Sequence, residues 1–163
     1  MKSLLLLRHA KSSWKNASLP DEERPLKGRG RRAAGLIGRF LNKRGLRPDL
    51  VLSSAATRAR ETVELVLEAA QFDVEVTYND RLYLACVTTL LDTVAKLDNK
   101  KQQVLLVGHN PGLEEFVFRL TGAQRRMPTA ALAQILIDSE RWGDVSRQQA
   151  CKLDLFVKPK ELL

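Results

Sequence analysis

The sequence predicts an α/β fold, a three-layer sandwich with a mostly parallel central sheet of about six strands and helices on both faces. Apolar runs of strand length recur along the chain, and segments with helical spacing of apolar residues separate them. This alternation is typical of parallel sheets that helices cover on both sides. At 163 residues the chain is long enough for a core of its own, and no repeat or linker divides it, so we expect a single domain over residues 1–163.

Six segments have the length and composition of strands. The first contains four consecutive leucines, a run that fits a strand buried on both faces. The last alternates apolar residues with Lys152 and Asp154, as expected of an edge strand. The predicted strands cover residues 4–7, 50–52, 74–76, 104–107, 132–137 and 151–157.

Helical spacing of apolar residues marks four segments between these strands. Gly45 is expected to end the first helix, and Ser54 to be the N-cap of the second. We expect Asn110 to cap the fourth helix, with Pro111 at its first position. The predicted helices cover residues 29–44, 55–70, 88–97 and a segment that starts after Asn110 and ends before Gly122.

The composition is that of a folded protein rather than a disordered or fibrous one, with 44% hydrophobic and 28% charged residues. No apolar stretch approaches the roughly 20 residues that span a bilayer. The apolar run near the N-terminus is also shorter than the roughly 7–15 residues of a signal peptide. We therefore expect a cytoplasmic protein without membrane contact. Cys86 and Cys151 are isolated, which predicts two free, buried thiols in a reducing compartment.

Positive charge is concentrated in one part of the chain. The net charge is +8, and residues 24–47 contain nine Lys or Arg and no acidic residue. Such a basic face can bind nucleic acid, a membrane surface or a phosphorylated partner, or it can be a solvated helix face. Because arginines and aromatic residues do not alternate there, we expect no nucleic acid. The role of this basic face stays open.

The two histidines of the chain occupy equivalent places in the predicted fold. His9 follows the first apolar strand directly after Arg8, and His109 follows the strand 104–107. The strand near residues 49–54 leads to Arg58, in the first turn of the next helix. In such sheets ligands bind outside the carboxyl ends of the strands, so these four side chains are expected to meet there. One histidine alone would more often be a core residue, but the convergence favours a functional site.

The combination of residues at this edge favours phosphate chemistry. Guanidinium groups and the first turns of helices both bind phosphate oxygens. A zinc site normally has three or more ligands, and the neighbours here are arginines, so we expect no metal and no cofactor. Covalent phosphoryl transfer remains, with neutral His9 as the nucleophile. Arg8, Arg58 and a protonated His109 would hold the phosphoryl oxygens, and water would release the phosphate.

Four motifs resemble those of a known family. RHA at 8–10 resembles the RHG signature of the histidine phosphatase superfamily, also called phosphoglycerate mutase-like, with Ala10 in place of glycine. RHAKSSW at 8–14 is similar to a motif of the mutases, although Lys15 stands where they have asparagine. The closer resemblance is to the SixA-like phosphohistidine phosphatases. It covers residues 3 to 137, in the expected order, through DEERPLKGRG at 21–30, SSAATRARET at 53–62 and VGHNPGLEE at 107–115.

The resemblance implies a phosphoglycerate mutase-like fold and a role for each matched residue. His9 would be the phosphorylated nucleophile, and Arg8, Arg58 and His109 would complete the phosphate pocket. Trp14 is expected to pack under the site. The neighbours expected to bind substrate are Ser12, Arg24 and Asn110, with Arg24 either at the rim or paired with Asp21 or Glu22.

The acidic proton donor of many superfamily members has no clear counterpart here. No glutamate follows Leu82 in DRLYLAC, 80–86, so Asp21 is the candidate general acid or water-positioning group, with Tyr83 at the pocket wall. A general acid contributes about 10²–10⁴-fold by protonating the leaving group. The imidazole of a phosphohistidine leaves from a labile P–N bond and needs that help less than an alkoxide does. Short connections, with little material for a lid, also favour a protein substrate.

The sequence thus predicts a metal-independent phosphatase with a covalent phosphohistidine intermediate, acting on phosphohistidine in a protein. The alternative within the same chemistry is a phosphomonoesterase for small phosphorylated metabolites. A third possibility, from another class, is a non-catalytic module that binds phosphate or nucleic acid through residues 24–47. We expect a monomer whose partner is a phosphorylated protein or a small phosphate ester.

Overall fold

The first strand lies near the middle of a six-stranded sheet with the order β3-β2-β4-β1-β5-β6. The computed structural model describes the backbone of residues 1–163 and every side chain except that of Gln148. Neighbouring strands are parallel for β1–β4, β2–β4 and β2–β3, and antiparallel for β1–β5 and β5–β6. The strands are β1 Lys2–Arg8, β2 Leu50–Ser54, β3 Glu75–Asn79, β4 Gln103–Gly108, β5 Leu132–Ile137 and β6 Cys151–Val157.

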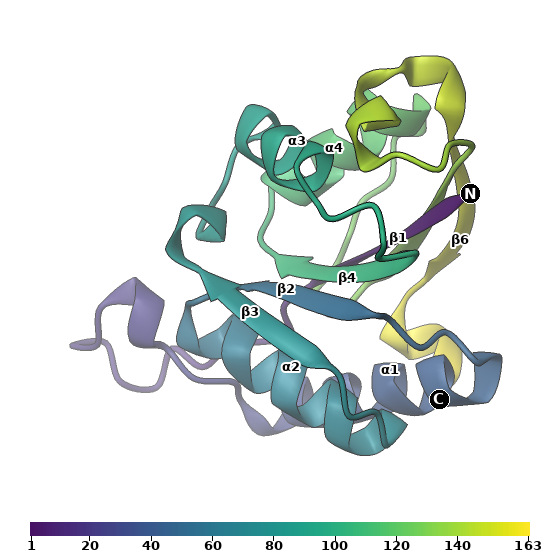
Figure 1. Ribbon diagram of the computed structural model, residues 1–163. Coiled ribbons are helices and arrows are strands. Elements are labelled where there is room, and N and C mark those ends of the chain that lie inside the picture. The colour runs from purple at the N-terminus through teal and green to yellow at the C-terminus, as the bar shows by residue number, and fades with distance from the viewer.

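Helices cover both faces of this sheet. α1 and α2 lie on one face, and α3 and α4 on the other (Figure 1). The helices are α1 Gly28–Arg44, α2 Thr57–Ala70, α3 Val87–Ala95 and α4 Gly112–Thr121. Short 3-10 helices are η1 Asp21–Glu23, η2 Asp80–Leu82, η3 Trp142–Ser146, η4 Gln148–Ala150 and η5 Pro159–Leu162. The predicted fold class is therefore confirmed.

The four leucines of β1 join the two halves of the core. Side chains alternate along a strand, so Leu5 and Leu7 pack with α1 and α2, whereas Leu4 and Leu6 pack with α3 and α4. All four are fully buried. Burying a leucine side chain contributes about 1.5–3 kcal/mol. This packing fixes the end of β1, where Arg8 and His9 follow.

Two predicted helix caps are wrong. α2 has Ala56 as its N-cap, and the hydroxyl of Ser54 instead accepts a hydrogen bond from the Ala56 N–H. α4 has Pro111 as its N-cap, because the side-chain amide of Asn110 donates to the carbonyl of Met127. Gly122 ends α4 in the left-handed conformation, as predicted.

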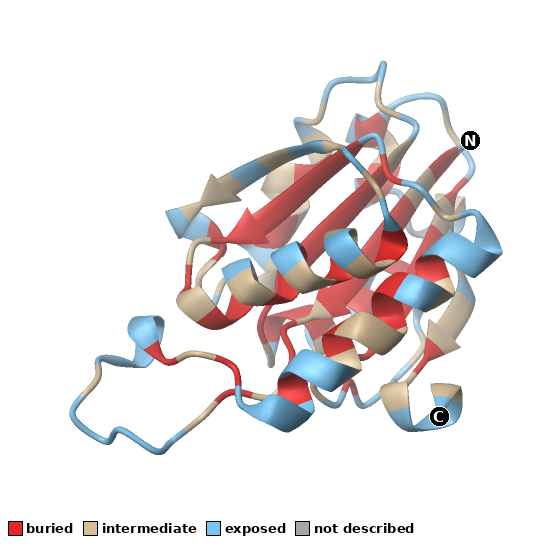
Figure 2. Ribbon diagram, turned by 90° about the horizontal axis from the view of Figure 1, so that it is seen from below, coloured by how far each residue is buried: buried red, intermediate tan, exposed pale blue. Residues whose placement is uncertain are grey.

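The connection between β1 and α1 also differs from the expectation of short loops. Residues 9–27 form a long excursion that projects from the body of the molecule (Figures 1 and 2). Its base is closed by a bridge between Ser12 and Leu26 and by a hydrogen bond from the Lys27 N–H to the Lys11 carbonyl. Trp14 lies on this excursion and is 69% exposed, so its predicted place beneath the site is wrong.

The two cysteines are free thiols, but the prediction that both are buried is wrong. Cys86 is exposed and Cys151 is half-buried. Cys86 precedes α3 in a surface turn, and Cys151 begins the edge strand β6, so neither position is inside the core.

Candidate active site

The parallel pairing of β1 and β4 brings the two histidines together. Arg8 pairs with Gly108 in the register of these strands, so His9 and His109 emerge side by side at the carboxyl edge of the sheet. Their ring centroids are 5.1 Å apart. The backbone N–H of His9 also donates to the carbonyl of Gly108, at 3.1 Å.

His9 is held with one ring nitrogen free for chemistry. Its Nδ1 lies 2.8 Å from the carbonyl oxygen of Ala10, and a carbonyl can only accept, so Nδ1 carries the proton. The lone pair is then on Nε2. Burial, with the nearby positive groups, lowers the pKa of His9 to about 3, so the ring is neutral at pH 7. A neutral imidazole with a free Nε2 is the form that acts as a nucleophile.

His109 is oriented by Ser54, a residue that the sequence analysis treated only as a helix cap. The Ser54 hydroxyl and His109 Nε2 are 2.8 Å apart and both are buried. Burial, and to a smaller extent the positive charge of Arg58, lowers the pKa of His109 to about 4. The prediction of a protonated His109 is therefore not met in these surroundings, since the cationic form is disfavoured by desolvation and by the neighbouring guanidinium. A neutral ring can still donate one N–H.

Arg58 enters the site from the first turn of α2 and is almost fully buried. Its guanidinium donates to the backbone carbonyl of Asp21 at 2.7 Å and to the Asp21 carboxylate at 3.0 Å. One turn later, Thr62 donates to the Arg58 carbonyl and accepts a hydrogen bond from the backbone N–H of Ala10. Thr62 thus ties α2 to the residue that follows His9.

Arg8 and Asn110 share one acceptor at the opposite wall. Each donates to the carbonyl of Met127, at 3.0 Å and 2.9 Å respectively. The segment before β5 therefore fixes residues that follow β1 and β4, and it aims both side chains at the same edge of the sheet.

Asp21 is surrounded by donors. Tyr83 donates from its hydroxyl to the carboxylate, and Arg24 and Arg58 both form ion pairs with it. The hydrogen bond from Tyr83 and those from the arginines hold the pKa of Asp21 well below its usual range. The carboxyl group is ionised at neutral pH and has no proton to give, which argues against Asp21 as the general acid. Tyr83 packs edge-on against His109, with centroids 5.3 Å apart, but it does not line the catalytic cavity as predicted.

Arg24 lies at the rim of the pocket and also pairs with Asp21, so both places that the sequence allowed for it are occupied. It is paired with Asp21, and it also donates to the Ser12 hydroxyl at 2.9 Å inside the pocket. The ring of Trp14 stacks over this guanidinium, 3.5 Å from its central carbon. The excursion thus brings a buried arginine and an exposed tryptophan to the rim.

A small cavity unites the predicted residues. Its volume is about 200 Å³. Arg8, His9, Arg58 and His109 line it, as do Ser12, Arg24 and Asn110; Asp21 stands behind Arg58. Trp14 also lines the cavity, and so do three residues that were not predicted to belong to the site, Lys11, Leu84 and Thr129.

Four buried side-chain atoms among the described residues have no hydrogen-bond partner, and all belong to this site. They are Arg8 Nε, Arg58 Nε, His109 Nδ1 and Asn110 Oδ1. An unmade hydrogen bond in a buried place costs about 1–3 kcal/mol, so proteins keep few of them. Three of these groups can donate. The arrangement therefore fits a ligand with several acceptor oxygens.

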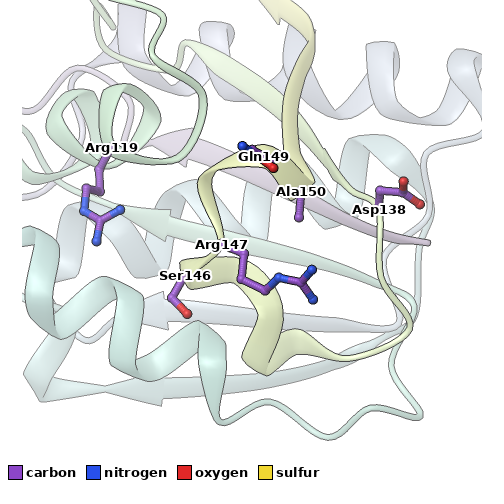
Figure 3. Close-up of a pocket in the computed structure, with 6 residues that line it drawn as sticks. All are labelled: Arg119, Asp138, Ser146, Arg147, Gln149 and Ala150. Atoms are coloured by element: carbon purple, nitrogen blue, oxygen red, sulfur yellow. The ribbon is translucent and has the colours of Figure 1, made fainter.

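A larger hollow elsewhere lacks such chemistry. It has a volume of about 610 Å³ and lies near the far end of β5, where Arg119 and Arg147 project (Figure 3). No histidine lines it. In the part of the chain that the structure describes, no three His, Cys, Asp or Glu side chains are grouped to hold a metal ion. Among the described helices, none combines the length and apolarity needed to cross a membrane.

The fold and the site define a phosphoglycerate mutase-like α/β protein with a paired-histidine, arginine-lined anion pocket. Comparisons with known proteins agree with this class. Residues 4–83 match the family model described as the histidine phosphatase superfamily (branch 1). An uncharacterised chloroplastic protein of Arabidopsis thaliana is 32% identical over 170 residues, which is 96% of this chain and 77% of the relative. An uncharacterised protein of Mycobacterium tuberculosis is 33% identical, over 85% of this chain and 91% of its own.

Solved structures of similar fold agree with this family assignment. A protein of Agrobacterium tumefaciens assigned to the phosphohistidine phosphatase SixA is 31% identical, with a TM-score of 0.83 over 97% of this chain and 98% of that one. The protein histidine phosphatase SixA in complex with tungstate shares the fold, with a TM-score of 0.85, 21% identity and 99% of both chains covered. The chain belongs to the histidine phosphatase superfamily, and it is a phosphatase of the SixA-like type.

Proposed function

We propose that residues 1–163 form one catalytic domain that hydrolyses phosphohistidine in a protein, without a metal ion and through a phosphorylated His9. One observation carries this proposal. Neutral His9, with Nε2 free, lines the same cavity as Arg8, Arg58 and His109, and each of these three has a buried nitrogen without a hydrogen-bond partner. A nucleophile and donors for several oxygens are the two requirements of phosphoryl transfer.

The reaction has two displacements at phosphorus. In the first, His9 Nε2 forms a P–N bond as the P–N bond to the substrate imidazole breaks, and that imidazole leaves with a proton. In the second, water attacks phosphorus, the bond to His9 breaks, and inorganic phosphate leaves. Arg8, Arg58 and His109 stabilise the charge on the phosphoryl oxygens in both transition states.

The lack of a protonated acid favours this substrate. Asp21 is ionised, so it cannot protonate an alkoxide leaving group in the first step. An imidazole needs less help, because it can take a proton from solvent before it leaves. The relatives assigned as phosphohistidine phosphatases support the same choice.

The cavity is too small to enclose more of a substrate than its phosphorylated group. Sites for small molecules are typically about 300–1,000 Å³. This cavity, at about 200 Å³, suits a phosphoryl group and the ring that bears it. The rest of the substrate must then lie outside the cavity.

The test is single-turnover phosphorylation of the enzyme by a phosphohistidine protein in the presence of EDTA. We expect a phosphorylated enzyme that is acid-labile, as phosphohistidine is, and that is absent in His9→Ala. Full turnover by His9→Ala, or loss of activity with EDTA, would contradict the mechanism.

A phosphomonoesterase for small metabolites is the second candidate, favoured by the general phosphate chemistry of the pocket. A panel that compares phosphohistidine protein with sugar and glycerol phosphates separates the two. Higher kcat/KM for the esters would support the second candidate. Salt-sensitive binding of RNA that survives His9→Ala, without turnover of either substrate, would instead indicate a binding module.

A further inference from the structure

A groove lies beside the catalytic cavity, along the start of α1. It has a volume of about 730 Å³, and it shares Arg8, Lys11 and Thr129 with the catalytic cavity. Its walls come from α1, from the segment before β5 and from the C-terminal residues around η5. The groove and the catalytic cavity are therefore neighbours on the surface of the molecule.

The lining of this groove is strongly basic. Besides Arg8 and Lys11, it includes Arg29, Arg32, Arg126, Lys158 and Lys160; we call the cavity lined by these residues the basic groove. Its one acidic residue, Glu114, accepts a hydrogen bond from the backbone N–H of Met127. Within the described residues, no ion pair engages any of the seven basic side chains.

Two of these arginines lie where the helix itself disfavours them. Arg29 and Arg32 are exposed in the first turns of α1, at the positive end of the helix dipole, and the first turn contains no acidic residue. The N-cap, Lys27, adds a further positive charge without a capping hydrogen bond. This concentration of charge weakens the helix start, so it points to a role in attracting an anionic partner.

Exposed apolar residues flank the same region. Five large hydrophobic side chains of the described chain are well exposed, and three of them border the catalytic cavity or the basic groove. These are Trp14, Leu84 at 54% exposure and Leu163 at 94%. Leu84 also has a φ of 48°, a left-handed conformation that is costly for a leucine and common at functional sites. Clustered exposed apolar residues are typical of protein contact surfaces.

We propose that the basic groove docks an acidic segment of the phosphohistidine protein, while Trp14 and Leu84, which line the neighbouring catalytic cavity, contact the surface around the phosphorylated histidine. This inference rests on the proposed function and names the partner of the same site. The basic side chains of the groove other than Arg8, which serves the phosphoryl group, complement Asp and Glu side chains, and the apolar residues nearby cover the surface around the phosphorylated histidine. A nucleic acid fits less well, because the exposed aromatic ring at the rim, Trp14, already stacks on Arg24.

Two synthetic peptides test the docking. Both carry one phosphohistidine; Asp and Glu flank it in the first, and Ser and Gly flank it in the second. The wild-type enzyme is expected to show a lower KM for the acidic peptide, by about tenfold at low salt, and the advantage shrinks as salt rises. Arg29→Glu/Arg32→Glu should remove that advantage, with kcat for both peptides and kcat/KM for the neutral peptide unchanged.

The matched control is Lys100→Glu/Arg141→Glu. It makes the same change in net charge on exposed residues that line neither the catalytic cavity nor the basic groove. This variant should behave as wild type on both peptides. If both double variants lose the preference equally, the effect is one of net charge alone and the docking groove is rejected.

The outcomes also separate this inference from the proposed function. Turnover of both peptides with equal KM would overturn the docking groove and leave the phosphatase proposal standing. Turnover of neither peptide, with no phosphorylated His9, would contradict the proposed function itself. The groove would instead be assigned to nucleic acid by two results together. RNA would displace the acidic peptide in a way that depends on Arg29 and Arg32, and the enzyme would show no preference between the two peptides.

Discussion

The contact between Ser54 and His109 gives the sharpest test of how the site is built. Ser54 is fully buried, and its hydroxyl is 2.8 Å from His109 Nε2. If Ser54 donates to Nε2, the proton of the neutral imidazole is on Nδ1, the atom without a partner. Ser54 would then be a positioning residue that presents an N–H to the phosphoryl group. Ser54→Ala removes that control of the tautomer.

The size of the effect follows from the burial of the pair. Ser54→Ala leaves His109 Nε2 without a partner, which costs about 1–3 kcal/mol. If that cost is carried in full by the transition state, kcat/KM falls about 5- to 140-fold, since 1.4 kcal/mol corresponds to tenfold. The same deletion also removes the acceptor of the Ala56 N–H, so stability falls as well.

Ser53→Ala is the matched control. Ser53 is equally buried, and its hydroxyl donates to the Ser54 carbonyl rather than to a histidine. We expect a comparable loss of stability from both variants in urea unfolding. Only Ser54→Ala should lower kcat/KM and change the ¹⁵N shifts that report the His109 tautomer. Equal kcat/KM in the two variants would refute the role assigned to Ser54.

Four further predictions follow from charge and close packing. Because burial lowers the pKa of His9 to about 3 and of His109 to about 4, the acid limb of a kcat/KM profile should lie near pH 4 rather than near 6.5. The unfolded chain binds more protons than the folded chain below pH 6.5, so the free energy of unfolding should fall as pH drops from 6.5 toward 3, and less steeply in His9→Asn. Gly30→Ala should destabilise the fold by about 1–3 kcal/mol in denaturant titrations, because the new Cβ would lie 2.2 Å from the Lys11 carbonyl oxygen. Gly35→Ala is the control and should be tolerated, because its Cβ would meet only the end of the flexible Arg39 side chain. Asp21→Asn removes the ion pair that holds Arg58, so kcat/KM should fall about tenfold while the shape of its pH profile is unchanged. Loss of one limb of that profile would instead show that Asp21 acts as a general acid.

The local pattern of the sequence was enough to predict the sheet and the convergence of Arg8, His9, Arg58 and His109 at one edge of it. Strand-length runs and helical spacing alternate clearly, and each of His9 and His109 directly follows a run of this kind. Parallel strands end at one edge, so the meeting of these residues followed from topology alone. Helix ends were less predictable, because Ser54 and Asn110 have side chains suited to capping but use them in tertiary contacts instead.

The excursion between β1 and α1 could not be predicted from local pattern. Trp14 reads as a core residue by its size, but the stack on Arg24 depends on a fold-back of the loop that only the tertiary structure reveals. The lowered pKa of Asp21 likewise depends on contacts that only the tertiary structure reveals. Its partners Tyr83 and Arg58 are far away in the sequence, and no spacing rule links them to it.

The small cavity and the ionised Asp21 together explain where specificity must come from. A cavity of about 200 Å³ that binds phosphoryl oxygens treats any phosphoryl group alike. Under the proposed mechanism, the lack of a protonated acid at Asp21 selects for a good leaving group, and phosphohistidine meets that requirement in any protein that carries it. Discrimination among such proteins requires contacts beyond the phosphorylated ring. The basic groove lies beside the cavity, and the exposed Trp14 and Leu84 stand at the cavity wall, so we expect these features to select the partner protein.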